Sequence, residues 1–438
     1  MPLLENLWWL IVLIGVMILV HEMGHYLAAR YFDVRIEVFS FGFGPRLIGF
    51  RRGETDFRVS LIPFGGYVKM AGEQPGEDAT DDPRAFVSKP RWQRLIIAAA
   101  GPLMNVALAV CLLTALFTVH YQKPPESLRQ AVIGHVFPDS PAAKAGLRDG
   151  DRILKLDEIE QPTWEDVILK EVASANRPLI LRVERDGQTF WTTVTPVLEE
   201  RTGLGYAGWA EQGEIQIANL TPGMPAEKAG LRRGDVLLNV DGQPIRSRYR
   251  LSEIIRASGG KPVTIEFMRE GRVQSVVVHP VYTNLDGTAR WMIGVEPSHR
   301  VEVTRLPLPE AFRESVRQNV KHATLIFRFL RGIVERRLSA RSIEGPIGIA
   351  RLSGEAAREG WPSFIFLMAV VSLNLAVFNL LPIPILDGGV ILVLLIEMAM
   401  QRELNQAVKE MVYKLGFVFL MAIVVFVLYN DIAKMLPG

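Results

Sequence analysis

The sequence predicts a multi-pass α-helical membrane protein with two tandem α+β domains between its second and third membrane-spanning helices. Hydrophobic residues make up 49% of the 438 residues, and four segments are apolar over lengths that suffice to cross a bilayer. These segments comprise residues 1–30, 94–119, 362–389 and 412–431. The chain between the second and third segments repeats itself, which indicates two copies of one fold. The lipid bilayer is thus the predicted environment, and the formal net charge of +2 argues against nucleic acid as a partner.

The charges around the first two segments predict the orientation of the chain. Basic residues follow the first segment and precede the second, so the positive-inside rule assigns the 31–93 loop to the cytoplasm and the repeats to the outer side. The first segment has no basic leader and no small-residue cleavage site, so we expect it to be retained. The sole cysteine, Cys111, lies in the second segment, and we expect no disulfide in the repeats.

The repeat keeps one register through both copies. Residues 141–151 match residues 225–235 at an offset of 84 residues. The same offset links Asp157 with Asp241, Pro178 with Pro262, Gly187 with Gly271 and Pro196 with Pro280. Turn and helix signals predict a strand, a short helix, a strand, a longer helix and two strands in each copy. We assign the copies to residues 128–200 and 212–284.

This pattern resembles the circularly permuted PDZ domains of bacterial envelope proteases. PDZ domains bind extended peptides or chain ends by adding a strand to a sheet edge, so the resemblance implies peptide ligands. Residues 203–207, with the sequence Gly-Leu-Gly-Tyr-Ala, precede the second copy and are expected to form its carboxylate-receiving loop. No equally clear glycine element precedes the first copy. Size filters or spacers are an alternative interpretation of both copies.

The first apolar segment contains the spacing of a zinc-hydrolase helix. His21 and His25 are four residues apart and therefore share one helix face, with Glu22 beside them. Ionisable groups are costly inside a membrane, which favours a functional role. Catalytic zinc usually holds three protein ligands and one water, and we expect Asp387, at the end of the third segment, to be the third. The alternative is a pair of hydrogen-bonded core imidazoles.

Two motifs together resemble the site-2 protease family over almost the whole chain. They are His21-Glu-Met-Gly-His25 and Asn379-Leu-Leu-Pro-Ile-Pro-Ile-Leu-Asp387-Gly, accompanied by Phe41–Gly44 and Pro63–Met70. The resemblance implies a zinc endopeptidase of the bacterial inner membrane, with periplasmic PDZ domains and Zn2+ near the cytoplasmic side. Its expected substrates are the transmembrane segments of single-pass proteins, such as a pre-trimmed anti-sigma factor or remnant signal peptides, in envelope stress signalling. The alternative is a catalytically idle PDZ-containing membrane scaffold.

The resemblance also implies residues that bind the substrate. Asn374 and Asn379 are expected to hold an unfolded substrate strand, which needs hydrogen-bond partners; pairing with other helices is the alternative. Residues 54–70 alternate polar and apolar side chains and predict a β-hairpin with a break at Gly65 and Gly66. Relatives suggest that such an element, here including Tyr67, is membrane-associated and clamps the substrate; an ordinary cytoplasmic loop is the alternative.

Residues 305–340 have apolar side chains at helical spacing among many basic ones. This pattern predicts an amphipathic helix on the membrane surface. A helix packed against the PDZ pair is the alternative interpretation.

Overall fold

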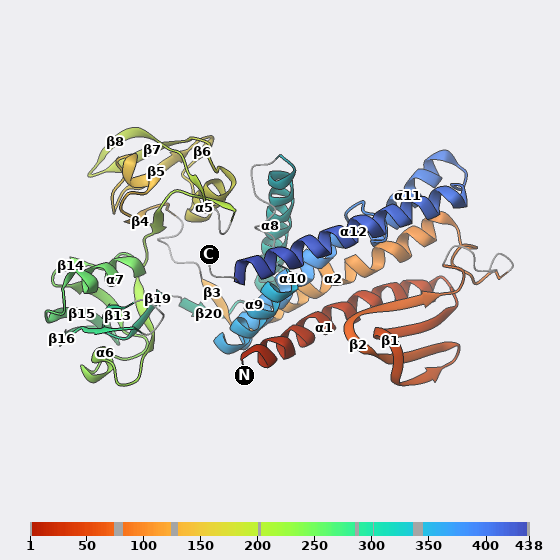
Figure 1. The fold of residues 1–438 in the computed structure, drawn as a ribbon, viewed down its shortest axis with the longest axis horizontal. Helices are drawn as coiled ribbons and strands as arrows, with labels where there is room; N and C mark the ends of the chain where they lie inside the picture. Colours follow the sequence, from red (N-terminus) through yellow and green to blue (C-terminus); the bar gives the residue numbers. More distant parts are fainter. Residues whose placement is uncertain are drawn as a thin grey trace. The chain divides into compact units, whose positions relative to one another are not determined.

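The computed structural model describes residues 2–73, 82–123, 130–199, 203–284, 289–300, 302–335 and 345–435. The chain forms two compact units (Figure 1). One, here called the membrane unit, contains the chain through Tyr121, the segment Arg305–Arg331 and the C-terminal helices. The other, here called the repeat unit, is formed mainly by Gln122–Thr304.

Four helices in the described part of the chain are long and apolar enough to cross a membrane. They are α1 (Pro2–Tyr31), α2 (Arg91–Val119), α10 (Trp361–Asn379) and α12 (Gln406–Met435). α2 packs against both α1 and α10, and glycine allows the close approach that is typical of membrane helices. A Cβ atom on Gly24 of α1 would lie only 2.4 Å from the carbonyl oxygen of Ala100 on α2. The prediction of four membrane segments is therefore confirmed at the level of length and composition.

The third predicted segment, residues 362–389, is not one helix. α10 ends at Asn379, and a separate apolar helix, α11 (Asp387–Met400), follows a break. Pro382 and Pro384 lie in the break, where neither can donate the N–H group that a continuous helix requires. Asp387 is consequently the first residue of α11 and not the end of α10. Its carboxylate lies at a helix N-terminus, where the unpaired N–H groups favour negative charge.

The amphipathic helix α8 (Leu308–Val334) lies within the range predicted for it; residues 336–340 are outside the described chain. Ala311 of α8 is fully buried in a cluster that includes residues of α2 and α10. Ser315 of α8 also forms a 2.8 Å hydrogen bond with Thr114 of α2. α8 thus packs on membrane helices along one face, while several of its large hydrophobic residues, among them Phe312, remain exposed.

A second amphipathic helix, α9 (Pro346–Glu359), is tied to the end of α12. The buried carboxylate of Asp431 on α12 accepts hydrogen bonds from the backbone N–H groups at the start of α9. These donors are Gly345 at 2.9 Å, Ile347 at 2.9 Å and Gly348 at 3.2 Å. The side chain therefore caps α9, because a helix leaves its first N–H groups without internal partners.

A curved β-element follows α1 and consists of β1 (Ile36–Arg52) and β2 (Thr55–Met70). The predicted hairpin within residues 54–70 is wrong: the turn precedes Thr55, and Gly65 and Gly66 lie inside β2. Both strands bend and pair twice, so that Phe39 lies opposite Val68 and also opposite Phe57. Sequence alternation correctly predicted extended strand in residues 54–70. It placed two arms of a hairpin there, whereas these residues form only one arm, β2, and the other arm is β1.

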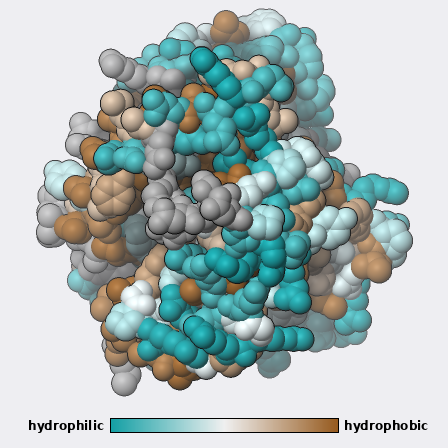
Figure 2. All heavy atoms as spheres, turned by 90° about the vertical axis from the view of Figure 1, so that its right-hand side faces the viewer, coloured by the Kyte–Doolittle hydropathy of each residue, from teal (hydrophilic) through white to brown (hydrophobic). Residues whose placement is uncertain are grey.

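The β-element also exposes large hydrophobic side chains. From the end of the molecule that carries it, hydrophobic side chains show as patches among hydrophilic ones (Figure 2). The exposed large hydrophobic residues of the β-element are Phe43, Leu47, Ile48, Phe50, Leu61 and Ile62. An apolar group of this kind on a water-exposed sheet marks a surface that contacts a partner or a lipid.

The repeat unit contains the same order of elements twice. The first copy comprises β4 (Ile133–Val136), α4 (Pro141–Lys144), β5 (Arg152–Leu156), β6 (Ile159–Glu160), α5 (Trp164–Ala173), β7 (Leu179–Arg185), β8 (Gln188–Val194), β9 (Val197–Glu199), β10 (Leu204–Tyr206) and β11 (Trp209–Glu211). The second comprises β12 (Ile215–Leu220), α6 (Pro225–Lys228), β13 (Val236–Val240), β14 (Gln243–Pro244), α7 (Arg248–Ala257), β15 (Val263–Arg269), β16 (Arg272–Val278), β17 (Val281–Thr283), β18 (Arg290–Met292) and β19 (Val295–His299). Each copy has its own apolar core. Two short strands, β3 (Tyr121–Lys123) and β20 (Glu302–Thr304), pair with each other.

Each copy extends further along the chain than predicted. β11 pairs with β4 of the first copy, and β19 pairs with β12 of the second. The predicted ends at residues 200 and 284 are therefore too early. The glycine-rich residues 203–207 belong to the first copy, because Ala142 of α4 donates a 2.8 Å hydrogen bond to the carbonyl of Ala207. The expectation that they serve the second copy is wrong.

Each copy contains its own buried ion pair, and the two pairs are related by the offset of 84 residues. Arg185 donates two hydrogen bonds to Asp151, at 2.6 and 2.7 Å. Arg269 does the same to Asp235, at 2.7 and 2.6 Å. Each aspartate is 1% exposed, and paired geometry of this kind satisfies both carboxylate oxygens.

We predict that Asp151→Ala lowers the free energy of unfolding of the first copy by about 3 kcal/mol, because it leaves a partly buried guanidinium without its partner. Hydrogen exchange of the β5 and β7 amides in the full-length protein measures the change. Glu160→Gln is the control: it breaks exposed pairs with Lys155 and Arg182 and should cost less than about 1 kcal/mol. Equal effects of the two substitutions would contradict the role assigned to the buried pair.

Candidate active site

The C-terminal half of α1 brings the two predicted histidines together. His21 and His25 are four residues apart, so both side chains leave the same face of the helix. Their Nε2 atoms are 3.2 Å apart. The residues are 7% and 9% exposed, respectively, so water contributes little to their surroundings.

Asp387 reaches the same point from α11. Its Oδ2 lies 3.2 Å from Nε2 of His21, and its Oδ1 lies 3.3 Å from Nε2 of His25. Among the described residues, these three are the one group of His, Cys, Asp or Glu residues that is spaced to share a metal ion. The break after α10 makes the contact possible, because it turns the chain so that α11 starts with Asp387.

The two imidazoles and the carboxylate are close enough to share one zinc ion. A tetrahedral zinc ion with bonds of about 2.0–2.1 Å keeps its donor atoms about 3.3 Å apart. Nε2 of His21 lies 3.2 Å from Nε2 of His25 and 3.2 Å from Oδ2 of Asp387, which matches this value. Nε2 of His25 lies 3.3 Å from the other carboxylate oxygen, Oδ1, and one donor atom from each residue lies within 4.8 Å of the other two. Two nitrogens and one carboxylate oxygen are also a donor set found in catalytic zinc sites, which leave one position for water. The residues present therefore fit the ion.

The proton on His25 is fixed by a neighbouring helix. Nδ1 of His25 lies 2.8 Å from the carbonyl oxygen of Ile97 on α2. A carbonyl only accepts hydrogen bonds, so Nδ1 carries the proton and Nε2 presents its lone pair. Metal-binding histidines are commonly oriented by an acceptor of this kind.

Gly101 of α2 makes room for His25 and was missed by the sequence analysis. A Cβ atom at this position would lie 2.2 Å from Nε2 of His25. Asn105, one turn further along α2, is fully buried, and its Nδ2 lies 3.2 Å from Nδ1 of His21. A glycine and an asparagine inside an apolar segment are the signals that identify such positions, since small and polar residues gather where membrane helices meet.

Glu22 lies between α1 and the β-element. The backbone of Val68 on β2 lies near its carboxylate. A Cβ atom on Gly66 would lie 3.2 Å from Cγ of Glu22, so the absence of a side chain lets β2 approach α1. Glu22 is next to the histidines in the chain but is outside the donor group. Its position suits proton transfer.

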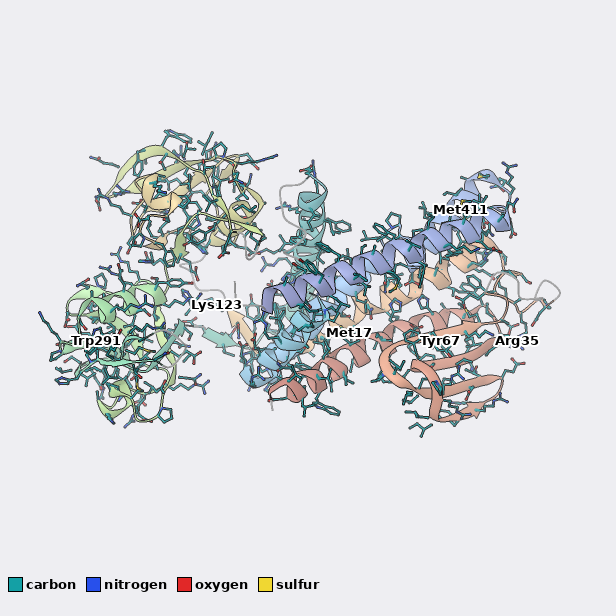
Figure 3. All side chains as sticks on the ribbon, in the orientation of Figure 1. Met17, Arg35, Tyr67, Lys123, Trp291 and Met411 are labelled. Atoms are coloured by element: carbon teal, nitrogen blue, oxygen red, sulfur yellow. The ribbon has the colours of Figure 1, made fainter. Side chains whose placement is uncertain are left out.

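The remaining predicted residues are more dispersed. Tyr67 of β2 hydrogen-bonds Arg58 and stacks on Phe43 at 6.0 Å between ring centroids. Gly65, with a φ of +117°, lies against the ring of Phe43. In Figure 3, Tyr67 lies on the β-element and Met17 lies on α1. Of the two predicted glycines, Gly66 is the one at which an added Cβ atom would meet Glu22.

The two asparagines of α10 are half-buried near the end of that helix. Asn379 is its last residue, and Asn374 lies five positions earlier. Ser372, two residues before Asn374, donates a 2.9 Å hydrogen bond to the main-chain oxygen of Asn105. α10 thus runs beside the helix that supports the histidines, but substrate contact by Asn374 and Asn379 stays a prediction.

A zinc-hydrolase donor set among membrane-spanning helices defines a membrane metallopeptidase. The family model described as peptidase family M50 matches residues 9–423, and the chain belongs to this family. The Regulator of sigma E protease of Salmonella typhi is 31% identical over 99% of this chain and 100% of its own length. The Regulator of sigma-E protease RseP of Escherichia coli (strain K12) is 30% identical over 97% of this chain and 98% of its own. A Putative zinc metalloprotease of Xylella fastidiosa (strain 9a5c) is 32% identical over 98% of both chains.

Among solved structures, the PDZ domain of the SdrC-like protein from Listeria innocua covers 20% of this chain and 96% of its own. The identity is 21% and the TM-score is 0.18, a score too low to define a shared fold. The class of this protein therefore rests on its family membership and on the relatives named above. The protein is a zinc-dependent metalloendopeptidase of the membrane, and the sequence-based prediction of an intramembrane protease that uses Zn2+ is confirmed.

We predict that Gly101→Ala lowers the zinc affinity about tenfold or more, the size of effect seen when the support of a metal ligand is lost. The added methyl group must displace the His25 ring. Alanine favours helix over glycine, so loss of α2 does not explain the effect. The zinc content of the purified protein after dialysis against a weak chelator measures it.

Leu103→Ala is the matched control, because Leu103 is on the same helix and 58% exposed. We expect it to leave the zinc content unchanged. Full zinc content in Gly101→Ala would show that α2 does not constrain His25 in the way described.

Proposed function

We propose that this protein hydrolyses peptide bonds within the transmembrane segments of single-pass membrane proteins, with zinc held by His21, His25 and Asp387. The observation that carries the proposal is the convergence of these three donors, from two helices, inside the membrane unit. An unpaired carboxylate and two unpaired imidazoles are costly in such surroundings. A shared cation removes that cost. A catalytically idle scaffold would have no reason to preserve this arrangement of donors.

In this mechanism Glu22 is the general base and acid. Zinc, when bound, polarises the scissile carbonyl and acidifies a water molecule. Glu22 takes a proton from that water as the oxygen adds to the carbonyl carbon. It then delivers the proton to the amide nitrogen as the carbon–nitrogen bond breaks. Its place beside the two histidines, but outside the donor group, supports this role.

The β-element supports binding of the substrate as an extended strand. Residues 66–68 of β2 pair with residues 39–41 of β1 on one side, and the ladders of the described chain give these three residues no partner strand on the other. The backbone of Val68 already reaches Glu22. A transmembrane helix satisfies its own peptide groups and must unwind before it is cut. We propose that Gly65, Gly66 and Tyr67 receive the unwound strand at this edge, and that Asn374 and Asn379 bind its peptide groups.

We further propose that the protein lies in a bacterial inner membrane with the 31–93 loop in the cytoplasm and the repeats in the periplasm. The basic residues that flank the first two spans support this orientation. It puts the zinc site near the cytoplasmic side, in the last third of α1. The exposed hydrophobic residues of the β-element and of α8 support contact with the bilayer surface. Relatives named as regulators of sigma E support substrates such as a pre-trimmed anti-sigma factor.

The two copies in the repeat unit, proposed here as PDZ domains, differ where a peptide's carboxylate would bind. In the first copy, Glu171 of α5 accepts hydrogen bonds from the Ala207 N–H at 2.6 Å and from Nε1 of Trp209 at 2.8 Å. Burial raises the pKa of Glu171, although these two hydrogen bonds oppose the rise. An internal carboxylate therefore already binds the glycine loop of the first copy.

Among the described residues of the second copy, no carboxylate takes the place of Glu171. Residue 255, at the offset of 84 from Glu171, is isoleucine and belongs to the apolar core. The matching loop contains Ile293, whose carbonyl accepts a 2.9 Å hydrogen bond from Ala226, and Gly294, with a φ of +79°. We propose that the second copy, and not the first, receives the end of a peptide chain.

We predict that Glu22→Gln lowers cleavage of a model single-pass substrate by about 10²- to 10⁴-fold, the usual contribution of a general base, and leaves the zinc content unchanged. Gel analysis of the cleaved substrate, with metal analysis of the same sample, measures both. The companion variant His21→Ala should lose zinc as well as activity. Undiminished cleavage by Glu22→Gln would contradict the mechanism.

We predict that a peptide with a free carboxyl end and a photoreactive side chain crosslinks to residues 215–299 of the full-length protein and not to residues 133–211. Mass spectrometry of the digested adduct locates the link. The same peptide with an amidated end is the control and should not crosslink, because the loop binds a carboxylate. Links to the first copy, or equal links from the amidated peptide, would exclude this assignment.

A further inference from the structure

Beyond the three donors, a buried polar side chain of the membrane unit lies against His21. Asn105 of α2 is 0% exposed, and its Nδ2 lies 3.2 Å from Nδ1 of His21. Its Oδ1 is buried and has no hydrogen-bond partner among the described residues. The main chain of Asn105 is held in place as well, because Ser372 of α10 donates a 2.9 Å hydrogen bond to its carbonyl oxygen.

This contact decides which nitrogen of His21 carries the proton. If Nδ2 of Asn105 donates to Nδ1, the proton of a neutral imidazole must be on Nε2. Nε2 is the atom that faces Asp387 at 3.2 Å, and a protonated nitrogen has no lone pair for a metal. Ligation by His21 therefore requires the opposite arrangement, with Nδ1–H as donor and an acceptor beside it.

Asn105 can supply that acceptor without any movement of the backbone. A half-turn of the side-chain amide exchanges its oxygen and nitrogen while keeping its shape. Oδ1, which otherwise lacks a partner, then accepts from Nδ1–H of His21. The amide NH2 group takes the former place of the oxygen and needs an acceptor there, such as water.

We propose that Asn105 is a positioning residue for zinc: through Oδ1 it holds His21 in the tautomer that binds the metal. The inference rests on the proposed role of His21 as a ligand. Oδ1 of Asn105 then accepts a hydrogen bond from Nδ1 of His21, just as the carbonyl oxygen of Ile97 accepts one from Nδ1 of His25. Both supports come from α2, so one helix orients both imidazoles.

The competing explanation is that Asn105 only joins helices, as polar residues in membrane spans often do. The two roles separate on zinc affinity and on the chemistry of the replacement. A joining role is lost equally in every variant that cannot donate a hydrogen bond. A positioning role through Oδ1 survives in aspartate, which has acceptor oxygens only.

The test compares Asn105→Leu with Asn105→Asp in the full-length protein, with zinc dissociation constants from competition against a chromogenic chelator. Leucine keeps the approximate shape of asparagine but cannot accept a hydrogen bond. We expect it to weaken zinc binding by about 10- to 100-fold, and we expect aspartate to stay within a few-fold of the wild type. Thr114→Val is the control, because Thr114 also joins α2 to another helix but is two turns away from the site.

Two results overturn the proposal: wild-type affinity in Asn105→Leu, or an equal loss in Asn105→Asp and Asn105→Leu. If the leucine variant does not fold, the aspartate variant decides alone, since it must keep near wild-type zinc affinity. His21→Ala separates this inference from the proposed function. Unchanged zinc binding in His21→Ala refutes the ligand assignment itself, whereas loss in His21→Ala with no loss in Asn105→Leu refutes only the role of Asn105.

Discussion

The structure depends on the attraction between one carboxylate and two imidazoles that meet inside a bundle of membrane helices. His21 and His25 face Asp387 at 3.2 and 3.3 Å, where an unshared charge would be costly. This constraint explains several local features at once. α10 must stop before Asp387 so that α11 can begin at the site, and Gly101 must lack a side chain so that the His25 ring fits. The helices around the site are arranged to bring these donors to one point.

A second constraint comes from the substrate. A transmembrane helix has no free peptide groups, so an enzyme that cuts it must offer new partners as the helix unwinds. In the proposed function the β-element meets this need, because residues 66–68 of β2 lie near Glu22 and pair with β1 on one side. This proposal links binding of the strand and proton transfer through one short stretch of β2. The two copies of the repeat unit differ at one matching position, with Glu171 in the first and Ile255 in the second, and we propose peptide recognition only for the second.

Much of this architecture follows from sequence, and the errors have physical causes. Helical spacing fixes the shared face of His21 and His25, and apolar length identifies the spans. The sequence analysis predicted one helix over residues 362–389 and missed the break after Asn379. The cause is that the apolar run continues through Pro382 and Pro384, although the helix does not. The segment 203–207 was given to the wrong copy because a repeat fixes an offset but not where each unit starts. A glycine and an asparagine inside an apolar segment mark a helix contact, but the particular roles of Gly101 and Asn105 depend on how α2 packs against α1, which the segment alone does not specify.

Zinc K-edge X-ray absorption of the full-length protein tests the central claim most directly, since it reads the ligands of the bound ion. The account predicts two imidazole nitrogens and carboxylate oxygen at about 2.0–2.1 Å, with no sulfur. The sulfur of Cys111, the sole cysteine, therefore takes no part. A spectrum with fewer than two imidazoles, or with a sulfur ligand, would contradict the assignment of His21, His25 and Asp387 to one metal ion.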